Sequence, residues 1–130
     1  MTGKNRRNII YSMVIEIPGI DTKKGLDLFE GDTDTYTEIL RSYVTNIPGS
    51  LEKMRNVSEA TLKDYAVKVH GVKSVSDSIG AEEARRTAKH LEELAKAGDL
   101  AGVQAENDAL IQYVENLIDA IDAWLKKNDL

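Results

Sequence analysis

The sequence contains two histidines, His70 and His90, and their imidazole rings are its clearest candidates for chemistry. Imidazole can act as a nucleophile or as a general acid or base near neutral pH, because its unperturbed pKa is about 6.5. The chain of 130 residues has no cysteine, which excludes disulfides, thiolate metal sites and thiol nucleophiles. Two histidines are also too few for a metal site built from three imidazoles. Any imidazole chemistry therefore has two candidate residues.

Other catalytic and binding motifs fail on spacing or charge. The nine glycines form neither a Walker loop nor a GxGxxG loop, so neither route to nucleotide binding is open. The run from Asp32 begins like a calcium loop, but tyrosines stand at its fifth and twelfth positions and threonine at its sixth. Neither histidine is preceded by the Glu-x-x spacing of a di-iron site. The net charge of -5 argues against nucleic-acid binding.

The elements that would position these residues are helices. Apolar residues recur at alternating spacings of three and four, which predicts long helices over about 32–57, 60–79, 81–97 and 100–124. A short helix capped by Asp21 should precede them and stop at Gly31, and Pro48-Gly49 should break or kink the first long helix. Because short loops make successive helices antiparallel neighbours, the predicted fold is all-α, an antiparallel up-down four-helix bundle with a short leading helix.

The N-terminal residues differ in composition from the rest of the chain. Residues 1–18 carry Lys4, Arg6 and Arg7 and are interpreted as an N-terminal arm or linker, whose run Ile9–Ile17 is either a short strand or extended. Residues 19–130 form the single predicted domain. No apolar stretch approaches the roughly 18 residues of a membrane span, and no signal-peptide cleavage site follows the arm. We therefore expect a cytoplasmic protein without membrane contact.

Helical phase separates the two histidines. His70 lies roughly 130° from the centre of the apolar stripe of helix 60–79, on the side facing solvent. An exposed histidine usually has no special role, but Lys73 follows three residues later and the surrounding face is small or apolar rather than charged. That face is predicted to point outward as a docking surface and carries Val67, Gly71, Ser74, Val75 and Ser78. His90 lies in a charged run, Arg85 to Lys89, and is interpreted as an ordinary surface residue.

The run HGVKSVSDSIGA, residues 70–81, resembles the signature of histidine-containing phosphotransfer (HPt) domains. The similarity covers about residues 18–126 and includes Gly19-Ile20-Asp21, Leu91-Glu92 and Gly98-Asp99. Two positions depart from the signature: Val72 replaces leucine in the core, and Ser74 replaces the glycine that leaves room for the phosphoryl group. Since serine is also small, we expect function to be retained, with an altered preference for partners.

The resemblance implies a phosphorelay carrier. His70 would accept a phosphoryl group from a receiver-domain aspartate and pass it to another, Lys73 would offset phosphoryl charge, and Ser74 would hydrogen-bond a phosphoryl oxygen or the ring. The implied partners are response-regulator receiver domains and a sensor histidine kinase, of which this chain could itself be a domain. Magnesium would be held by the receiver, so the chain needs no cofactor. A monomer is expected. The alternative is a structural or protein-binding helical bundle in which His70 is incidental.

Overall fold

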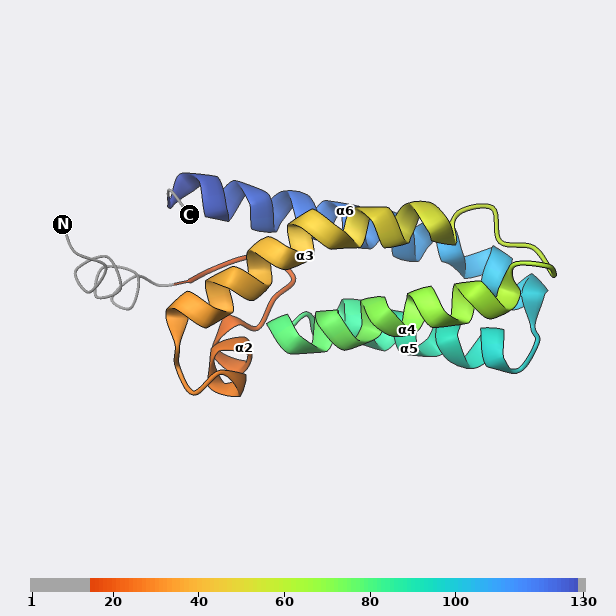
Figure 1. The fold of residues 1–130 in the computed structure, drawn as a ribbon, viewed down its shortest axis with the longest axis horizontal. Helices are drawn as coiled ribbons and strands as arrows, with labels where there is room; N and C mark the ends of the chain where they lie inside the picture. Colours follow the sequence, from red (N-terminus) through yellow and green to blue (C-terminus); the bar gives the residue numbers. More distant parts are fainter. Residues whose placement is uncertain (1–14, 129–130) are drawn as a thin grey trace.

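The computed structural model describes residues 15–128, and Figure 1 shows their arrangement. Residues 1–14 and 129–130 lie outside the described part, and with them most of the predicted arm 1–18. Within residues 15–128 the structure contains helices and no strand. The helices are α2 (Thr22–Leu28), α3 (Thr33–Met54), α4 (Leu62–Ile79), α5 (Glu82–Lys96) and α6 (Leu100–Lys127). The prediction of an all-α helical bundle is confirmed.

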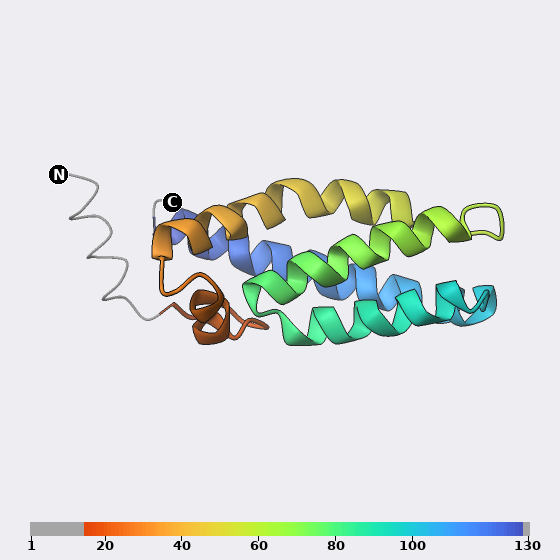
Figure 2. The ribbon, with the colours of Figure 1, turned by 60° about the horizontal axis from the view of Figure 1, so that its bottom comes forward.

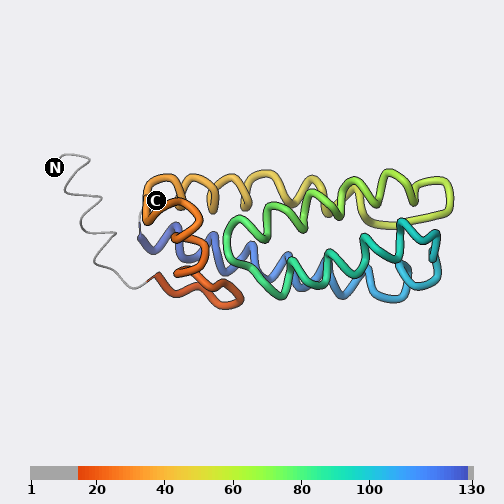
Figure 3. The backbone as a smooth tube through the Cα atoms, turned by 90° about the horizontal axis from the view of Figure 1, so that it is seen from below, coloured from red at the N-terminus to blue at the C-terminus, as the bar shows by residue number. Residues whose placement is uncertain are grey.

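The four long helices lie along the long axis of the molecule, and each reverses the direction of the one before it (Figures 1 and 2). Helix α3 packs against α4 and α6, and α5 packs against α4 and α6. The short helix α2 covers the end where α4 finishes and α5 begins (Figure 3). In the described part of the chain, no helix is both long enough and apolar enough to cross a bilayer.

The core is built from the apolar stripes expected from the sequence. On α4, Tyr65, Val69 and Val72 are buried, and on α5 the buried residues include Ala84 and Ala88. Small alanine side chains let α5 approach α4 closely, because little volume separates the two backbones. This close approach determines how near side chains on α4 and α5 can come to each other.

Two hydrogen bonds between buried side chains join helices across the core. The Tyr43 and Ser76 hydroxyls are 2.9 Å apart, which links α3 to α4. The Tyr65 hydroxyl donates to Asn107 Oδ1 at 2.8 Å, which links α4 to α6. An unpaired buried hydroxyl costs roughly 1–3 kcal/mol, so these bonds favour one relative placement of the helices. Helix α4 is therefore held by specific contacts to its neighbour α3 and, across the core, to α6.

The predicted interruption at Pro48-Gly49 is not a break, because α3 is one helix from Thr33 to Met54 with Pro48 inside it. Pro48 is exposed, whereas Ile47 and Leu51 on either side are buried. Proline removes one backbone hydrogen bond, but the apolar stripe on both sides still packs against the core and maintains the helix. At the start of the domain, Ile15 and Ile17 are also buried in the core.

The turn between α4 and α5 depends on Gly80, which has φ of +83°. Its carbonyl accepts a hydrogen bond from Asp21 N at 2.9 Å, and a Cβ at this position would lie 2.2 Å from the Asp21 carbonyl oxygen. Gly98 ends α5 with φ of +75°, but a Cβ there would meet nothing within 4 Å. The two glycines therefore share a left-handed conformation and differ in the space around them.

Replacing Gly80 with alanine should lower the free energy of unfolding by at least about 2 kcal/mol, since left-handed strain and a backbone clash add together. Gly98→Ala is the matched control and should cost about 1 kcal/mol from strain alone. Urea denaturation of both variants measures the difference. Equal losses in the two variants would contradict the clash at Gly80.

Candidate functional site

His70 lies in the middle of α4, between the buried residues Val69 and Val72 on the core side. Its side chain is 56% exposed, as the helical phase predicts. The ring is nevertheless not surrounded by solvent alone, because α5 lies directly beside α4. Residues of α5 therefore determine the hydrogen bonding of the imidazole ring.

Glu92 of α5 is the direct partner of His70. The distance from His70 Nδ1 to Glu92 Oε2 is 2.6 Å, and the glutamate side chain is only 4% exposed. A carboxylate can only accept hydrogen bonds, so Nδ1 donates and carries the proton. In the neutral ring, Nε2 then holds the lone pair, and it has no hydrogen-bond partner among residues 15–128. The contact thus determines which nitrogen of the neutral ring keeps its lone pair.

Two lysines complete the surroundings of Glu92. Lys73 Nζ lies 2.6 Å from Glu92 Oε1, and Lys96 Nζ lies 3.2 Å from Oε2. Burial on its own would raise the pKa of Glu92, but hydrogen bonds from Lys73, Lys96 and His70 outweigh it and lower that pKa to about 2. Glu92 is therefore ionised at neutral pH, and a buried negative charge lies next to the ring.

No pattern within the sequence assigns Glu92 a role beside His70. One signal could have indicated its burial. Glu92 lies four residues after Ala88 and three before Ala95, both buried, so it falls at the edge of the inner stripe of α5. Lys96 follows at the favourable spacing of four residues. What the pattern of one helix cannot show is that this edge meets His70.

The structure places the predicted site residues on different parts of α4. Lys73, expected to serve a phosphoryl group directly, has its ammonium on Glu92 and is half-buried. Ser74 is exposed one turn after His70, and its carbonyl accepts a hydrogen bond from the Ser78 hydroxyl at 3.1 Å. Lys73 therefore belongs to the cluster around Glu92, while Ser74 lies beside the ring on the outer surface.

The predicted docking face is only partly exposed. Val67 is 67% exposed, and Gly71 is exposed with open space where a Cβ would stand. Val75 and Ser78, which were also predicted to point outward, are both half-buried, and Val75 packs against the core. Val75 lies three residues after Val72 and four before Ile79, which places it beside the buried stripe. The accessible apolar surface near His70 is thus concentrated at Val67 and Gly71.

His90 differs from His70 in the burial of its partner. His90 Nε2 lies 3.1 Å from Glu106 Oε2 on α6, and both side chains are about half exposed. Water competes with such a pair, so it orders the ring weakly. Neither histidine belongs to a metal site: among residues 15–128, no group of three His, Cys, Asp or Glu side chains could hold an ion. Within the described residues, the candidate site is therefore the cluster of His70, Glu92, Lys73 and Lys96.

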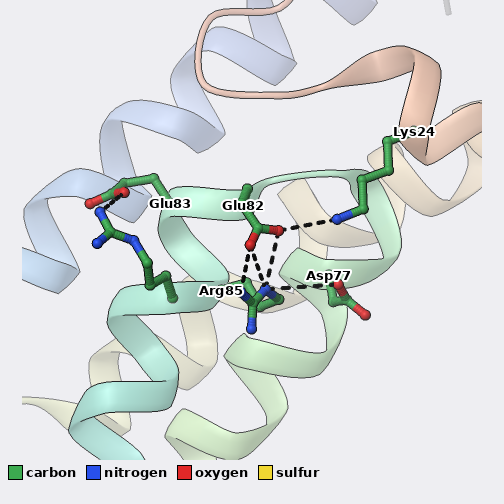
Figure 4. Close-up of polar contacts among 6 residues, drawn as sticks. Lys24, Asp77, Glu82, Glu83 and Arg85 are labelled. Atoms are coloured by element: carbon green, nitrogen blue, oxygen red, sulfur yellow. Dashed lines mark hydrogen bonds and ion pairs between the residues drawn. The ribbon is translucent and has the colours of Figure 1, made fainter.

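Figure 4 shows the ion pairs that hold the end of α4 to α5 and α2. Glu82 pairs with Lys24 of α2 at 3.2 Å, and the guanidinium of Arg85 binds the same carboxylate and approaches Asp77 of α4 at 4.0 Å. Hydrogen bonds from Arg85 and then Lys24 lower the pKa of Glu82 to about 2. These contacts position the start of α5 against α4, and hence support the approach of Glu92 to His70.

Comparison with known proteins gives one match. A family model described as the Hpt domain matches residues 38–124, which include all of α4 and α5 and most of α3 and α6. The His70 and Glu92 pair lies inside the matched range. No curated protein and no solved structure matches the chain.

Proposed function

The chain belongs to the Hpt domain family, and from that membership we propose that it is a phosphorelay carrier whose phosphoacceptor is His70. Hpt domains take part in phosphotransfer within two-component signalling, with receiver domains and kinases as their partners. The proposal adds that His70 accepts the group from one receiver aspartate and returns it to another. The observation that carries it is the bond between His70 Nδ1 and the buried Glu92, which leaves Nε2 free to react.

The reaction can be written on these atoms. The Nε2 lone pair attacks the phosphorus of an aspartyl phosphate, an N–P bond forms, and the O–P bond breaks to release the aspartate carboxylate. Because Nδ1 keeps its proton, the phosphorylated ring carries a positive charge. The ionised Glu92, 2.6 Å away, stabilises that charge as it develops. In the reverse step a second receiver carboxylate attacks phosphorus, and the electrons of the N–P bond return to Nε2.

Lys73 and Lys96 place two ammonium groups at the edge of the site. Both bind Glu92 in the unphosphorylated protein, and we assign them a second role in offsetting charge on the phosphoryl oxygens. The magnesium ion that such transfers use belongs, in this proposal, to the receiver domain. The chain then supplies a nucleophile, a carboxylate and two cations, with no cofactor of its own.

Other parts of the proposal concern the state of the whole chain. The four long helices form an antiparallel up-down bundle that acts as a rigid platform for the ring. We propose that the protein works in the cytoplasm as a monomer, with a sensor histidine kinase as the ultimate source of its phosphoryl group. A binding bundle without phosphotransfer is the alternative, and the labelling experiment below separates the two.

The test uses two phosphoryl donors. Phosphoramidate is a small donor that phosphorylates accessible imidazoles and needs no docking surface, whereas a phosphorylated receiver domain needs one. Each donor should give this protein one phosphoryl label that is labile in acid and stable in alkali, as a phosphohistidine is. Absence of the label with phosphoramidate would overturn the assignment of a phosphoacceptor.

Replacing Ser74 with glycine should leave the rate of transfer from a phosphorylated receiver equal to or above that of the parent. Ser74 lies one turn after His70, and removing its side chain opens space for the incoming partner. Glycine inside α4 should lower the free energy of unfolding by roughly 0.5 kcal/mol. Transfer assays quenched at successive times measure the rate, and urea denaturation measures the free energy of unfolding. A large loss of rate would instead mean that the hydroxyl binds the phosphoryl group.

A further inference from the structure

A groove of about 360 Å³ lies between the C-terminal end of α3 and the N-terminal part of α4. It is lined by Lys53, Thr61, Asp64, Val67 and Lys68. Val67 is 67% exposed, and Leu28 is the other large hydrophobic side chain with comparable exposure in the described chain. The groove thus combines an exposed apolar side chain with two lysines.

The groove is continuous with the surface around His70. Val67 precedes His70 by three residues on α4, so the two side chains are neighbours on successive turns. Gly71 follows His70 directly and has no side chain to cover the helix surface beside the ring. Figure 2 shows the α3–α4 connection at the end of the molecule from which α4 runs toward His70. A protein domain that brings an aspartyl phosphate to Nε2 would also reach Val67 and the groove beside it.

The charge of the groove is opposite to that of the chain. The chain has a net charge of -5, yet the groove contains two lysines and one acid, Asp64. Lys53 and Lys68 make no ion pair with any residue from 15 to 128. Their ammonium groups are therefore available to a carboxylate of another molecule. A receiver domain that reaches Val67 from His70 and carries an acidic side chain at its rim would complement these two lysines in charge.

We propose that this groove is a second contact site for the receiver domain, which inserts an apolar side chain against Val67 and pairs a carboxylate with Lys53 or Lys68. The inference rests on the proposed phosphotransfer function and adds a determinant of partner choice away from the reacting atoms. Charges at the rim of an interface act mainly on the rate of association and on its salt dependence. The groove selects acidic receivers over others before the phosphoryl group moves.

The test compares charge reversals in the groove with one elsewhere. Lys53→Glu and Lys68→Glu are made singly and together, and Lys127→Glu, at the opposite end of the molecule, is the matched control (Figure 1). A panel of receiver domains is phosphorylated with acetyl phosphate and used as donors to His70. The double variant should show a roughly tenfold lower second-order rate constant for transfer, with a weaker dependence on salt, while Lys127→Glu is unchanged.

Phosphoramidate separates this inference from the proposed function. All variants should be labelled by phosphoramidate at the parental rate, since that donor does not occupy the groove. If the parent itself is not labelled, the proposed function fails. If phosphoramidate labels the parent but no receiver does, or if receivers label parent and double variant equally fast, the groove is not their contact site. A parent that dimerises, with a monomeric double variant, would assign the groove to a second copy and overturn the proposal.

Discussion

Replacing His70 with glutamine should abolish completely the phosphoryl label that a phosphorylated receiver transfers. An amide nitrogen has no available lone pair, so the variant has no nucleophile at this position. The amide can still donate a hydrogen bond to Glu92, which keeps the buried carboxylate from losing a partner. The variant should therefore fold like the parent, and thermal unfolding followed by circular dichroism checks that it does.

His90→Gln is the matched control for this experiment. His90 also pairs with a glutamate, but Glu106 is half exposed and α6 presents no buried carboxylate there. The same chemical change at this site should leave the label and its rate as in the parent. A label that persists in the His70 variant, or that disappears in the His90 variant, would show that the phosphoacceptor is a different residue.

Replacing Glu92 with glutamine should slow phosphoryl transfer by between about tenfold and a hundredfold. Glutamine is nearly isosteric and can still accept a hydrogen bond from Nδ1, but it carries no negative charge to stabilise the developing cation on the ring. It also leaves Lys73 and Lys96 without their common carboxylate. Single-turnover transfer from a phosphorylated receiver measures the loss. Glu93→Gln, at the neighbouring exposed position, should transfer at the parental rate.

Two readouts separate this positioning role from a general loss of stability. Nitrogen chemical shifts of the neutral His70 ring should show the proton on Nδ1 in the parent and a mixture of the two tautomers in Glu92→Gln. A parental tautomer together with a parental rate would contradict the role of Glu92. The second readout is the pH dependence of the free energy of unfolding in the acid range.

The folded protein holds the pKa of Glu92 at about 2, below the ordinary value of 4.5. The stabilisation from its ionised form is therefore present above about pH 4.5 and is lost as the pH falls from there toward 2. Glu92→Gln removes this contribution, so its free energy of unfolding should decline less steeply over that range than the parent's. Glu93→Gln should follow the parental curve there.

The elements of this fold could be predicted from the sequence because their signals are local. Alternating steps of three and four located α4 and α6, Asp21 caps α2 as expected, and Gly80 ends α4 in a left-handed conformation. Of the break or kink expected at Pro48, the break does not occur, because packing on both sides outweighs one missing hydrogen bond. Local propensity decides a helix end only where tertiary contacts do not oppose it.

The candidate site likewise combines features that follow from one helix with features that depend on contacts between helices. The outward position of His70 follows from the phase of its own helix, and the structure confirms its exposure. The role of Glu92 depends on how α5 rotates and slides against α4, which no pattern within one helix determines. The half-burial of Val75, by contrast, follows from the phase of α4, since its spacing from Val72 and Ile79 places it beside the buried stripe. Contacts between helices are thus what the structure adds.

The tight turn at Gly80 also affects how the protein folds. His70 and Glu92 are separated by 22 residues and lie on the two arms of one helical hairpin, so bringing them together closes a short loop. The entropy lost on closing a loop grows with its length, and contacts that are near in sequence form quickly. The histidine–glutamate pair can therefore assemble as soon as α4 and α5 dock. In kinetic terms the candidate site needs one hairpin of adjacent helices rather than the completed bundle.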